Sequence, residues 1–461
     1  MSTHELPVAV IGGGPVGLAA AAHLVARGIE VNIYEAGASV AANVDSWGHV
    51  HLFSPWRFNI DAAAKALLQD HGWQEPRGDV LPTGRELIDA YLEPLARIPA
   101  ISQRLHTKTR VLSVGRQGAD KVVSRNRAER PFALTVANGS GPARIELARA
   151  VIDASGTWQN PNPLGASGNP AIGEREHGSR IAFGVPDVLR HDRATYAGKR
   201  VLVVGGGHSA ANVLLDLARL GESEPQTHIT WVVRGESLAR VIGGGRADKL
   251  AARGKLGLDL AALVESKRVQ LVLGFGAESV QGTDLGVTVT GAGGRVLGPF
   301  DRIVVATGQR PDLDMTRELR LDLDPWLESP RLLGPMIDPN LHSCGTVPPH
   351  GYRELAHPEP GYFAVGVKSY GRAPTFLMAT GYEQVRSVTA LLAGDEAAAN
   401  DVRLVLPETG VCSTDLAPTE SAGCCGGPAP AEVDACCVAD ATAKAAGASG
   451  CGCGSSAARA A

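Results

Sequence analysis

Hydrophobic residues run in short, regularly spaced blocks, and their order predicts strands that alternate with helices. The apolar run that begins at Val8 ends in a glycine-rich turn, an alanine-rich helical stretch follows, and a second apolar run ends on Glu35. The same order returns from Arg200, where a run, a turn and a helical stretch lead to a run that ends on Arg234. Strand–helix–strand units favour parallel sheets covered by helices, so we predict an α/β protein with two three-layer Rossmann-like domains.

The remaining pattern adds further elements around these two units. The helix expected from Thr83 has Glu86 three residues later, which completes a capping box. A segment from Trp47 to Phe58 is rich in aromatic and turn residues. Helices are expected at 61–71, 83–97 and 375–392, and strands at 106–117, 145–156, 302–306 and 361–367.

Both turns carry the glycine spacing of dinucleotide-binding sites. The first glycine makes the tight turn, the second lets backbone N–H groups approach a pyrophosphate, and the third position allows close contact between helix and strand. The residues at these turns are Gly12, Gly14, Pro15 and Gly17 in the first, and Gly205, Gly207, His208, Ser209 and Ala210 in the second.

The residues that end the following strands differ in charge, which distinguishes the two nucleotides. A carboxylate such as Glu35 accepts hydrogen bonds from a ribose diol, whereas an arginine such as Arg234 suits a ribose that carries a 2′-phosphate. We therefore predict FAD at the first site and NADPH at the second.

The late strand at 361–367 indicates that the chain returns to its first domain, so the NADPH domain is expected to be inserted in the FAD domain. The tail is rich in Ala, Gly, Pro, Ser and Cys and is expected to be disordered, because it lacks the large apolar residues of a core. The FAD domain is predicted to comprise residues 1–165 and 325–395. A linker is predicted at 166–198, the NADPH domain at 199–324 and the tail at 396–461.

Composition narrows the class of protein. A net charge of −4 over 461 residues argues against nucleic-acid binding, and no apolar run is long enough to span a bilayer. The apolar N-terminus is broken by glycines and is not expected to be a signal peptide, so a cytoplasmic protein is predicted.

Seven of the eight cysteines follow residue 411, which fits a body without disulfides in a reducing compartment. A homodimer is left open, and no metal site is expected before the tail.

The tail holds three closely spaced thiol pairs. Adjacent cysteines form disulfides only with strain, but they place two soft ligands on one centre, which suits trivalent arsenic. The spacing is unlike that of a zinc module, and an extension without function is the other interpretation. The pairs are Cys424 with Cys425, Cys436 with Cys437, and Cys451 with Cys453.

These motifs resemble the two-dinucleotide-binding flavoproteins, and the stretches PTGRELIDAYLEPLA and DASGTWQNPNP look most like the flavin-containing monooxygenase branch. Some proteins of this type with cysteine-rich tails are associated with arsenic resistance, and this chain is similar to them. The resemblance implies that NADPH reduces FAD, and that molecular oxygen then reacts to oxygenate a soft nucleophile, namely nitrogen, sulfur or trivalent arsenic.

The chain departs from the family pattern in four places. The branch tends to carry an asparagine near the flavin, and the analogous stretch HLFSPWRFN here offers Ser54, Pro55 and Asn59 without a clear match. It lacks the C-x-x-C dithiol of the reductases, because no cysteine precedes Cys344. The monooxygenase motif before the second turn has the wrong spacing around Phe183 and His191. The glycine-aspartate motif of the flavin site reads Gly366-Val367-Lys368.

The resemblance also assigns further cofactor contacts. Val111 is expected near adenine and Gly156 near the pyrophosphate. The loop that ends at Thr375 precedes a helix whose N-terminus would face the flavin. The catalytic residue stays unassigned, with Ser54, Asn59 and Arg372 as candidates.

Three functions remain open at this point. The first is an NADPH-dependent FAD monooxygenase, the second is a disulfide or metalloid reductase that uses the tail thiols, and the third is a metalloid-binding flavoprotein sensor.

Overall fold

The computed structural model describes residues 5–404 and 406, except 239–241, 243–250 and 343–346. The predicted tail therefore lies largely outside the described residues, as do all eight cysteines. The α/β class predicted from the hydrophobic pattern is confirmed, because two five-stranded sheets pair entirely in parallel.

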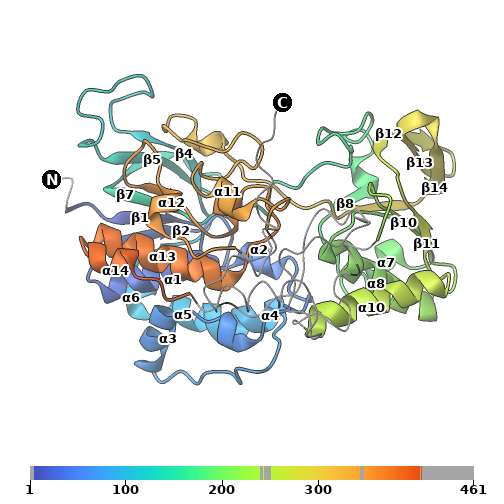
Figure 1. Ribbon diagram of the computed structural model, residues 1–461, viewed down its shortest axis with the longest axis horizontal. Helices are drawn as coiled ribbons and strands as arrows, with labels where there is room; N and C mark the ends of the chain where they lie inside the picture. The colour runs from blue at the N-terminus through green and yellow to red at the C-terminus, as the bar shows by residue number, and fades with distance from the viewer. Residues whose placement is uncertain (1–4, 239–241, 243–250, 343–346, 405, 407–461) are drawn as a thin grey trace, which may run out of the picture. The chain divides into compact units, whose positions relative to one another are not determined.

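The first parallel sheet joins the beginning of the chain to its late return strand (Figure 1). Its order is β16-β7-β1-β2-β3, so residues 362–364 lie in the same sheet as residues 8–11. The bounds are β1 Val8–Ile11, β2 Val31–Tyr34, β3 Leu105–His106, β7 Ala150–Asp153 and β16 Tyr362–Ala364.

The second parallel sheet has the order β11-β10-β9-β15-β8. Its edge strand β8 falls inside the segment expected to be a linker, so that segment is not all connection. The bounds are β8 Ile181–Phe183, β9 Arg200–Val204, β10 His228–Val232, β11 Gln270–Val272 and β15 Arg302–Val305.

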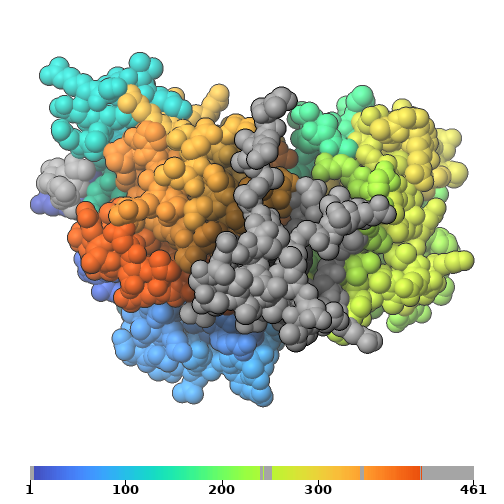
Figure 2. Space-filling model, in the orientation of Figure 1, coloured from blue at the N-terminus to red at the C-terminus, as the bar shows by residue number. Residues whose placement is uncertain are grey.

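Each parallel sheet is covered on one face by an antiparallel sheet of three strands. The order is β4-β5-β6 in the first domain and β12-β13-β14 in the second. The connection between β4 and β5 stands out from the surface in Figure 2, and its Val122 is 85% exposed. The bounds are β4 Thr109–Arg116, β5 Phe132–Asn138, β6 Arg144–Ala148, β12 Ala277–Thr283, β13 Gly286–Gly291 and β14 Val296–Phe300.

Helices cover the opposite face of each parallel sheet. In the first domain α1 packs against α13 and α3, and in the second α8 packs against α10 (Figure 1). The longer helices are α1 Pro15–Ala26, α3 Ala62–Gln69, α8 His208–Ser223, α10 Ala251–Glu265 and α13 Met378–Leu392. The shorter ones are α2 Ala42–Asp45, α4 Gly84–Leu87, α5 Glu93–Arg97, α6 Pro99–Ser102, α7 Arg193–Tyr196, α11 Gly334–Ile337, α12 Tyr352–Leu355 and α14 Glu396–Asn400.

Side chains that alternate along the central strands produce the three layers. In β1, Val8 and Val10 belong to the core shared with the helices, whereas Ala9 and Ile11 belong to the core shared with the antiparallel sheet. Strand β9 repeats this division. Because successive side chains of a strand point to opposite faces, a strand buried on both sides reads as one continuous apolar run, as these do.

Two expected elements differ in detail. The strand predicted over 145–156 divides at Arg149, because β6 pairs in the antiparallel sheet and β7 in the parallel one. The helix predicted over 83–97 is interrupted by a π-helical turn at Ile88–Leu92. Its predicted start is confirmed, since the Thr83 side chain accepts from the Glu86 N–H and the Glu86 carboxylate accepts from the Thr83 N–H.

Candidate nucleotide-binding sites

The first glycine-rich turn is packed so closely that glycine is required in it. Gly12 has φ +100°, and a Cβ there would lie 2.6 Å from the carbonyl oxygen of Ala154, in the strand-end motif that follows β7. A Cβ on Gly17 would lie 1.9 Å from the carbonyl oxygen of Gly12. These contacts bring the start of α1 directly against the ends of β1 and β7.

The start of α1 is arranged to receive an anion. Gly14 is the N-cap residue, Pro15 is the first helical residue, and no side chain caps the helix. A Cβ on Gly14 would have no neighbouring atom within 4 Å. The N–H groups of a first helical turn carry partial positive charge, so the open space over Gly14 fits a phosphate group.

Glu35 immediately follows β2 and connects two backbone turns. Its Oε2 accepts from the Gly13 N–H at 2.7 Å and its Oε1 from the Gly37 N–H at 2.6 Å. The residue is 9% exposed and borders a cavity of about 220 Å³. A carboxylate has about four acceptor positions, so these two bonds leave acceptors for ribose hydroxyl groups.

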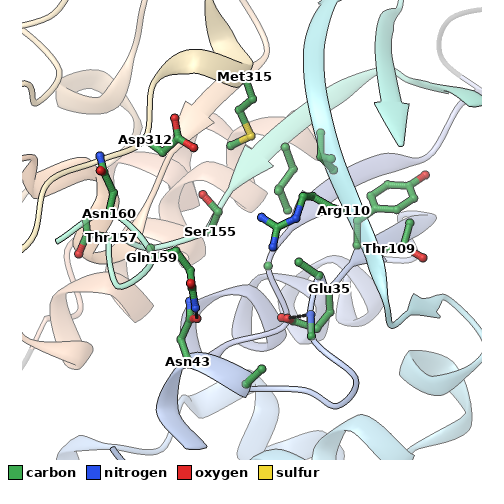
Figure 3. Close-up of a pocket in the computed structure, with 18 residues that line it drawn as sticks. Glu35, Asn43, Thr109, Arg110, Ser155, Thr157, Gln159, Asn160, Asp312 and Met315 are labelled. Atoms are coloured by element: carbon green, nitrogen blue, oxygen red, sulfur yellow. Dashed lines mark hydrogen bonds between the residues drawn. The ribbon is translucent and has the colours of Figure 1, made fainter. Parts of the chain in front are cut away.

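The cavity brings together four residues that the sequence assigned to FAD, namely Gly12, Glu35, Val111 and Gly156. Figure 3 shows Arg110 and Met315 extending toward the same space, and neither was anticipated from the sequence. The cavity is smaller than most whole-ligand pockets, so it suits one arm of an extended dinucleotide. Other lining residues missed in the sequence are Asn43, Thr109, Ser155, Thr157, Gln159, Asn160 and Asp312.

A buried ion pair lies directly behind this cavity. The Lys368 ammonium lies 2.7 Å from Asp153 Oδ2 and donates to Ser155 Oγ at 3.0 Å. Asp153 is fully buried, and the Tyr362 hydroxyl donates to it at 2.9 Å. Burial, together with the Asp153 charge, raises the pKa of Tyr362 well above its usual value, so this phenol acts only as a donor to the carboxylate.

The second glycine-rich turn repeats the geometry of the first. Gly205 has φ +140°, and a Cβ there would lie 2.2 Å from the carbonyl oxygen of Ala306, in the strand-end motif after β15. Gly207 is the N-cap of α8, with open space where its Cβ would be. Ala210, at the third position, is fully buried against the sheet. Ser209, in the same first turn of α8, is partly exposed.

His208 is the first residue of α8 and contacts the aromatic segment of the first domain. Its ring packs edge-on against Phe53, with 5.0 Å between the ring centroids. Val50, from the same segment, packs against the hydrophobic core of the second domain. The segment 47–58 thus lies beside the second glycine-rich turn.

Arg234 lies two residues beyond β10, whereas Glu35 follows β2 at once. The difference arises because the Val233 N–H still bonds to the Val272 carbonyl oxygen and extends the strand irregularly. Arg234 is exposed, and its Nη1 donates to the Ala166 carbonyl oxygen at 3.0 Å. The other guanidinium N–H groups of Arg234 are donors that a phosphate group could accept from.

The three candidates for catalysis lie in different settings. Ser54 Oγ donates to Asn59 Oδ1 at 2.7 Å, and the Asn59 amide donates back to the Ser54 carbonyl oxygen. Asn59 is fully buried, so this pair shapes its loop. Arg372 is exposed, and Thr375 is buried three residues before α13. A catalytic role for any of them stays a prediction.

The six cysteines predicted to bind a metalloid lie outside the described residues. Within the residues that the structure does describe, no group of three or more His, Cys, Asp or Glu side chains is arranged to hold a metal ion. The same portion of the chain contains no helix with the length and apolar character needed to cross a membrane.

The two parallel sheets with their paired glycine-rich turns define a two-dinucleotide-binding flavoprotein fold. The chain belongs to the pyridine nucleotide-disulphide oxidoreductase family, whose model matches residues 9–330. It is accordingly a flavin-dependent oxidoreductase. No protein of curated function matches the sequence significantly.

Solved structures with the same fold include both reductases and monooxygenases. The bacillithiol disulfide reductase of Bacillus cereus has a TM-score of 0.63 at 20% identity, over 84% of this chain and 99% of that one. The FAD-bound cadaverine monooxygenase of the desferrioxamine pathway from Erwinia amylovora has a TM-score of 0.58 at 14% identity, over 90% and 99%. The flavin-containing monooxygenase of Stenotrophomonas maltophilia has a TM-score of 0.50 at 22% identity, over 84% and 99%.

Proposed function

We propose that this protein is an NADPH-dependent FAD monooxygenase that oxygenates a soft nucleophile: nitrogen, sulfur or trivalent arsenic. The observation that carries the proposal is the pair of matched glycine-rich turns in a chain whose first 343 residues contain no cysteine. A body with two nucleotide sites and no dithiol has no thiol route for electrons within those residues. Electrons from the flavin would then pass to oxygen or to the tail.

The described residues fit FAD at the first site. Gly14 leaves open space for a diphosphate at the start of α1, Gly12 allows the tight turn before it, and Glu35 borders the cavity with spare acceptors for a ribose. Val111 and Gly156 line the same cavity. When bound, FAD would supply the redox chemistry, namely a hydride acceptor for the nicotinamide that can afterwards react with oxygen.

NADPH would occupy the second site. Gly205, Gly207, His208 and Ser209 would hold its diphosphate at the start of α8, and Arg234 would pair with the 2′-phosphate. The chain contributes binding and orientation. The aromatic segment beside the second turn, which includes Phe53, would help to exclude water from the space between the nucleotides.

Trivalent arsenic is proposed among the acceptors because of the tail. Six of its thiols stand in three close pairs, and thiolates are soft ligands that prefer soft centres. The tail would then bind the substrate and raise its concentration near the flavin. A role in arsenic detoxification follows from the proposal.

The same thiols favour a second candidate, a flavin-dependent disulfide or metalloid reductase. In that case, electrons would pass from the flavin to a tail disulfide or to a bound metalloid. The bacillithiol disulfide reductase shows that this fold can serve a disulfide reductase, and its likeness to this chain is one of fold alone.

One set of assays separates the two candidates. FAD-loaded protein is given NADPH and ¹⁸O₂ with trivalent arsenicals, amines or thioethers, and oxygen uptake and product mass are measured. Substrate-stimulated oxygen uptake with ¹⁸O in the product, retained when the six paired cysteines are changed to serine, supports the monooxygenase. Anaerobic NADPH oxidation driven by a disulfide or arsenate, and lost in the serine variant, supports the reductase and overturns the first proposal.

A further inference from the structure

Lys368 has an unusual place for a lysine. It follows β16 at the position where a flavin-site motif is altered, and its side chain is 1% exposed. Lysine is almost never fully buried unless it is paired, because burial of an unpaired ammonium group is very costly. The structure provides the partner in Asp153, at 2.7 Å, from the end of β7.

Asp153 shapes the wall of the FAD cavity. Its Oδ1 accepts from both the N–H of Ser155, at 3.1 Å, and the hydroxyl of Ser155, at 2.7 Å. Its Oδ2 is shared by Lys368 and by the Tyr362 hydroxyl. A carboxylate with four such bonds has all its acceptor positions in use, and two of the four bonds fix Ser155 at the start of the turn.

This turn lies against the proposed seat of the diphosphate. The Cα of Ser155 would be only 3.0 Å from a Cβ on Gly12, and Ser155 and Gly156 both line the cavity. A bare carboxylate at Asp153, bonded directly to Ser155 in this wall, would therefore lie close to a ligand that carries two negative charges. In a buried site that repulsion is only weakly screened.

We propose that Lys368 is the counter-ion that lets Asp153 hold the Ser155–Gly156 turn without repelling the diphosphate of FAD. Lys368 is thus a positioning residue, which acts through Asp153 and Ser155. This inference rests on the proposed FAD site.

The test removes the charges one at a time. At pH 8, Lys368→Met keeps the length of the side chain but leaves the carboxylate uncompensated, so FAD and ADP are expected to bind at least about tenfold more weakly. Adenosine lacks the diphosphate, so its own dissociation constant should stay within about twofold of the wild-type value. Lys368→Arg should bind FAD within about threefold of the wild type. The matched control is Lys255→Met, which removes an exposed lysine paired with Asp259 at 2.6 Å.

The double variant Asp153→Asn with Lys368→Met makes the result decisive. A charge effect predicts that neutralising the carboxylate restores most of the affinity for ADP. A purely structural pair predicts equal losses for ADP and adenosine and no rescue, which would overturn the inference. If Lys368→Met does not fold, Asp153→Asn alone serves as the test: ADP should bind at least as tightly as to the wild type, and weaker binding refutes the idea. A wild-type chain that never binds FAD would instead refute the proposed function.

Discussion

Glu35 accepts the backbone N–H of Gly13 at 2.7 Å, so the residue that follows β2 also fixes the turn that opens α1. One side chain thus connects the predicted ribose site to the predicted diphosphate site. Its second oxygen accepts from Gly37 and holds the chain beyond the strand in place. The carboxylate is therefore expected to organise the site before any nucleotide arrives.

Glu35→Gln tests this organisation. The amide loses the negative charge and turns an N–H₂ donor toward a backbone N–H, so FAD should bind about 10- to 100-fold more weakly, as expected for the loss of charge-assisted hydrogen bonds. Titration of flavin fluorescence with apoprotein measures the dissociation constant. Glu30→Gln, at an exposed ion pair with Arg104, is the control. Equal affinities for FAD in the two variants would contradict the assignment.

Two glycines of the second turn separate stability from binding. At Gly205 an added Cβ would lie 2.2 Å from a backbone oxygen in a positive-φ conformation, so Gly205→Ala should lower the free energy of unfolding by about 3 kcal/mol. Gly207 has open space, so Gly207→Ala should cost no more than about 1 kcal/mol. Urea unfolding measures both.

The binding of NADPH should respond differently. The methyl group of Gly207→Ala enters the space over the start of α8, so the affinity for NADPH should fall about tenfold although the protein remains folded. Full NADPH affinity in Gly207→Ala would show that the nucleotide does not lie over this helix.

Much of the fold follows from local pattern. The runs that became β1, β2, β9 and β10 are apolar throughout because both faces of each parallel sheet are covered, and the capping box at Thr83 needs only neighbours in sequence. The break between β6 and β7 was missed, because nothing local at Arg149 indicates that the chain changes sheets.

The site was less predictable where partners are distant in sequence. The two glycine-rich turns can be recognised from their glycine spacing, and Glu35 and Arg234 from their charge after an apolar strand. The bond between Lys368 and Ser155 joins residues 213 positions apart, and a lysine after an apolar strand looks exposed in the sequence alone. Arg110 and Met315 likewise reach the cavity only through the packing of the antiparallel sheet and the segment after β15.

Arg234 should select between the two nicotinamide nucleotides. Its guanidinium can pair with a 2′-phosphate, which NADH lacks, so Arg234→Ala should reduce kcat/KM for NADPH about 10- to 100-fold and leave that for NADH within about twofold. Steady-state oxidation of each nucleotide by the FAD-loaded protein provides the measurement. Arg219→Ala, an exposed arginine of α8, is the control. A parallel fall for both nucleotides would mean that Arg234 has a structural role.

His357 should make stability depend on pH. Burial lowers the pKa of His357 from 6.5 to about 4, and its Nδ1 accepts from the Asp322 N–H at 3.2 Å, so protonation there would break that bond. A lowered folded-state pKa means that the stabilisation is complete above about pH 6.5 and is lost as the pH falls toward 4. The loss is at most about 3 kcal/mol.

Urea unfolding of wild type and His357→Gln at several pH values measures this loss, with the exposed His71→Gln as control. The His357→Gln profile should be flatter than the wild-type profile between pH 6.5 and 4, because the amide still accepts a hydrogen bond but does not titrate. Identical slopes in the two proteins would assign the acid sensitivity to other groups.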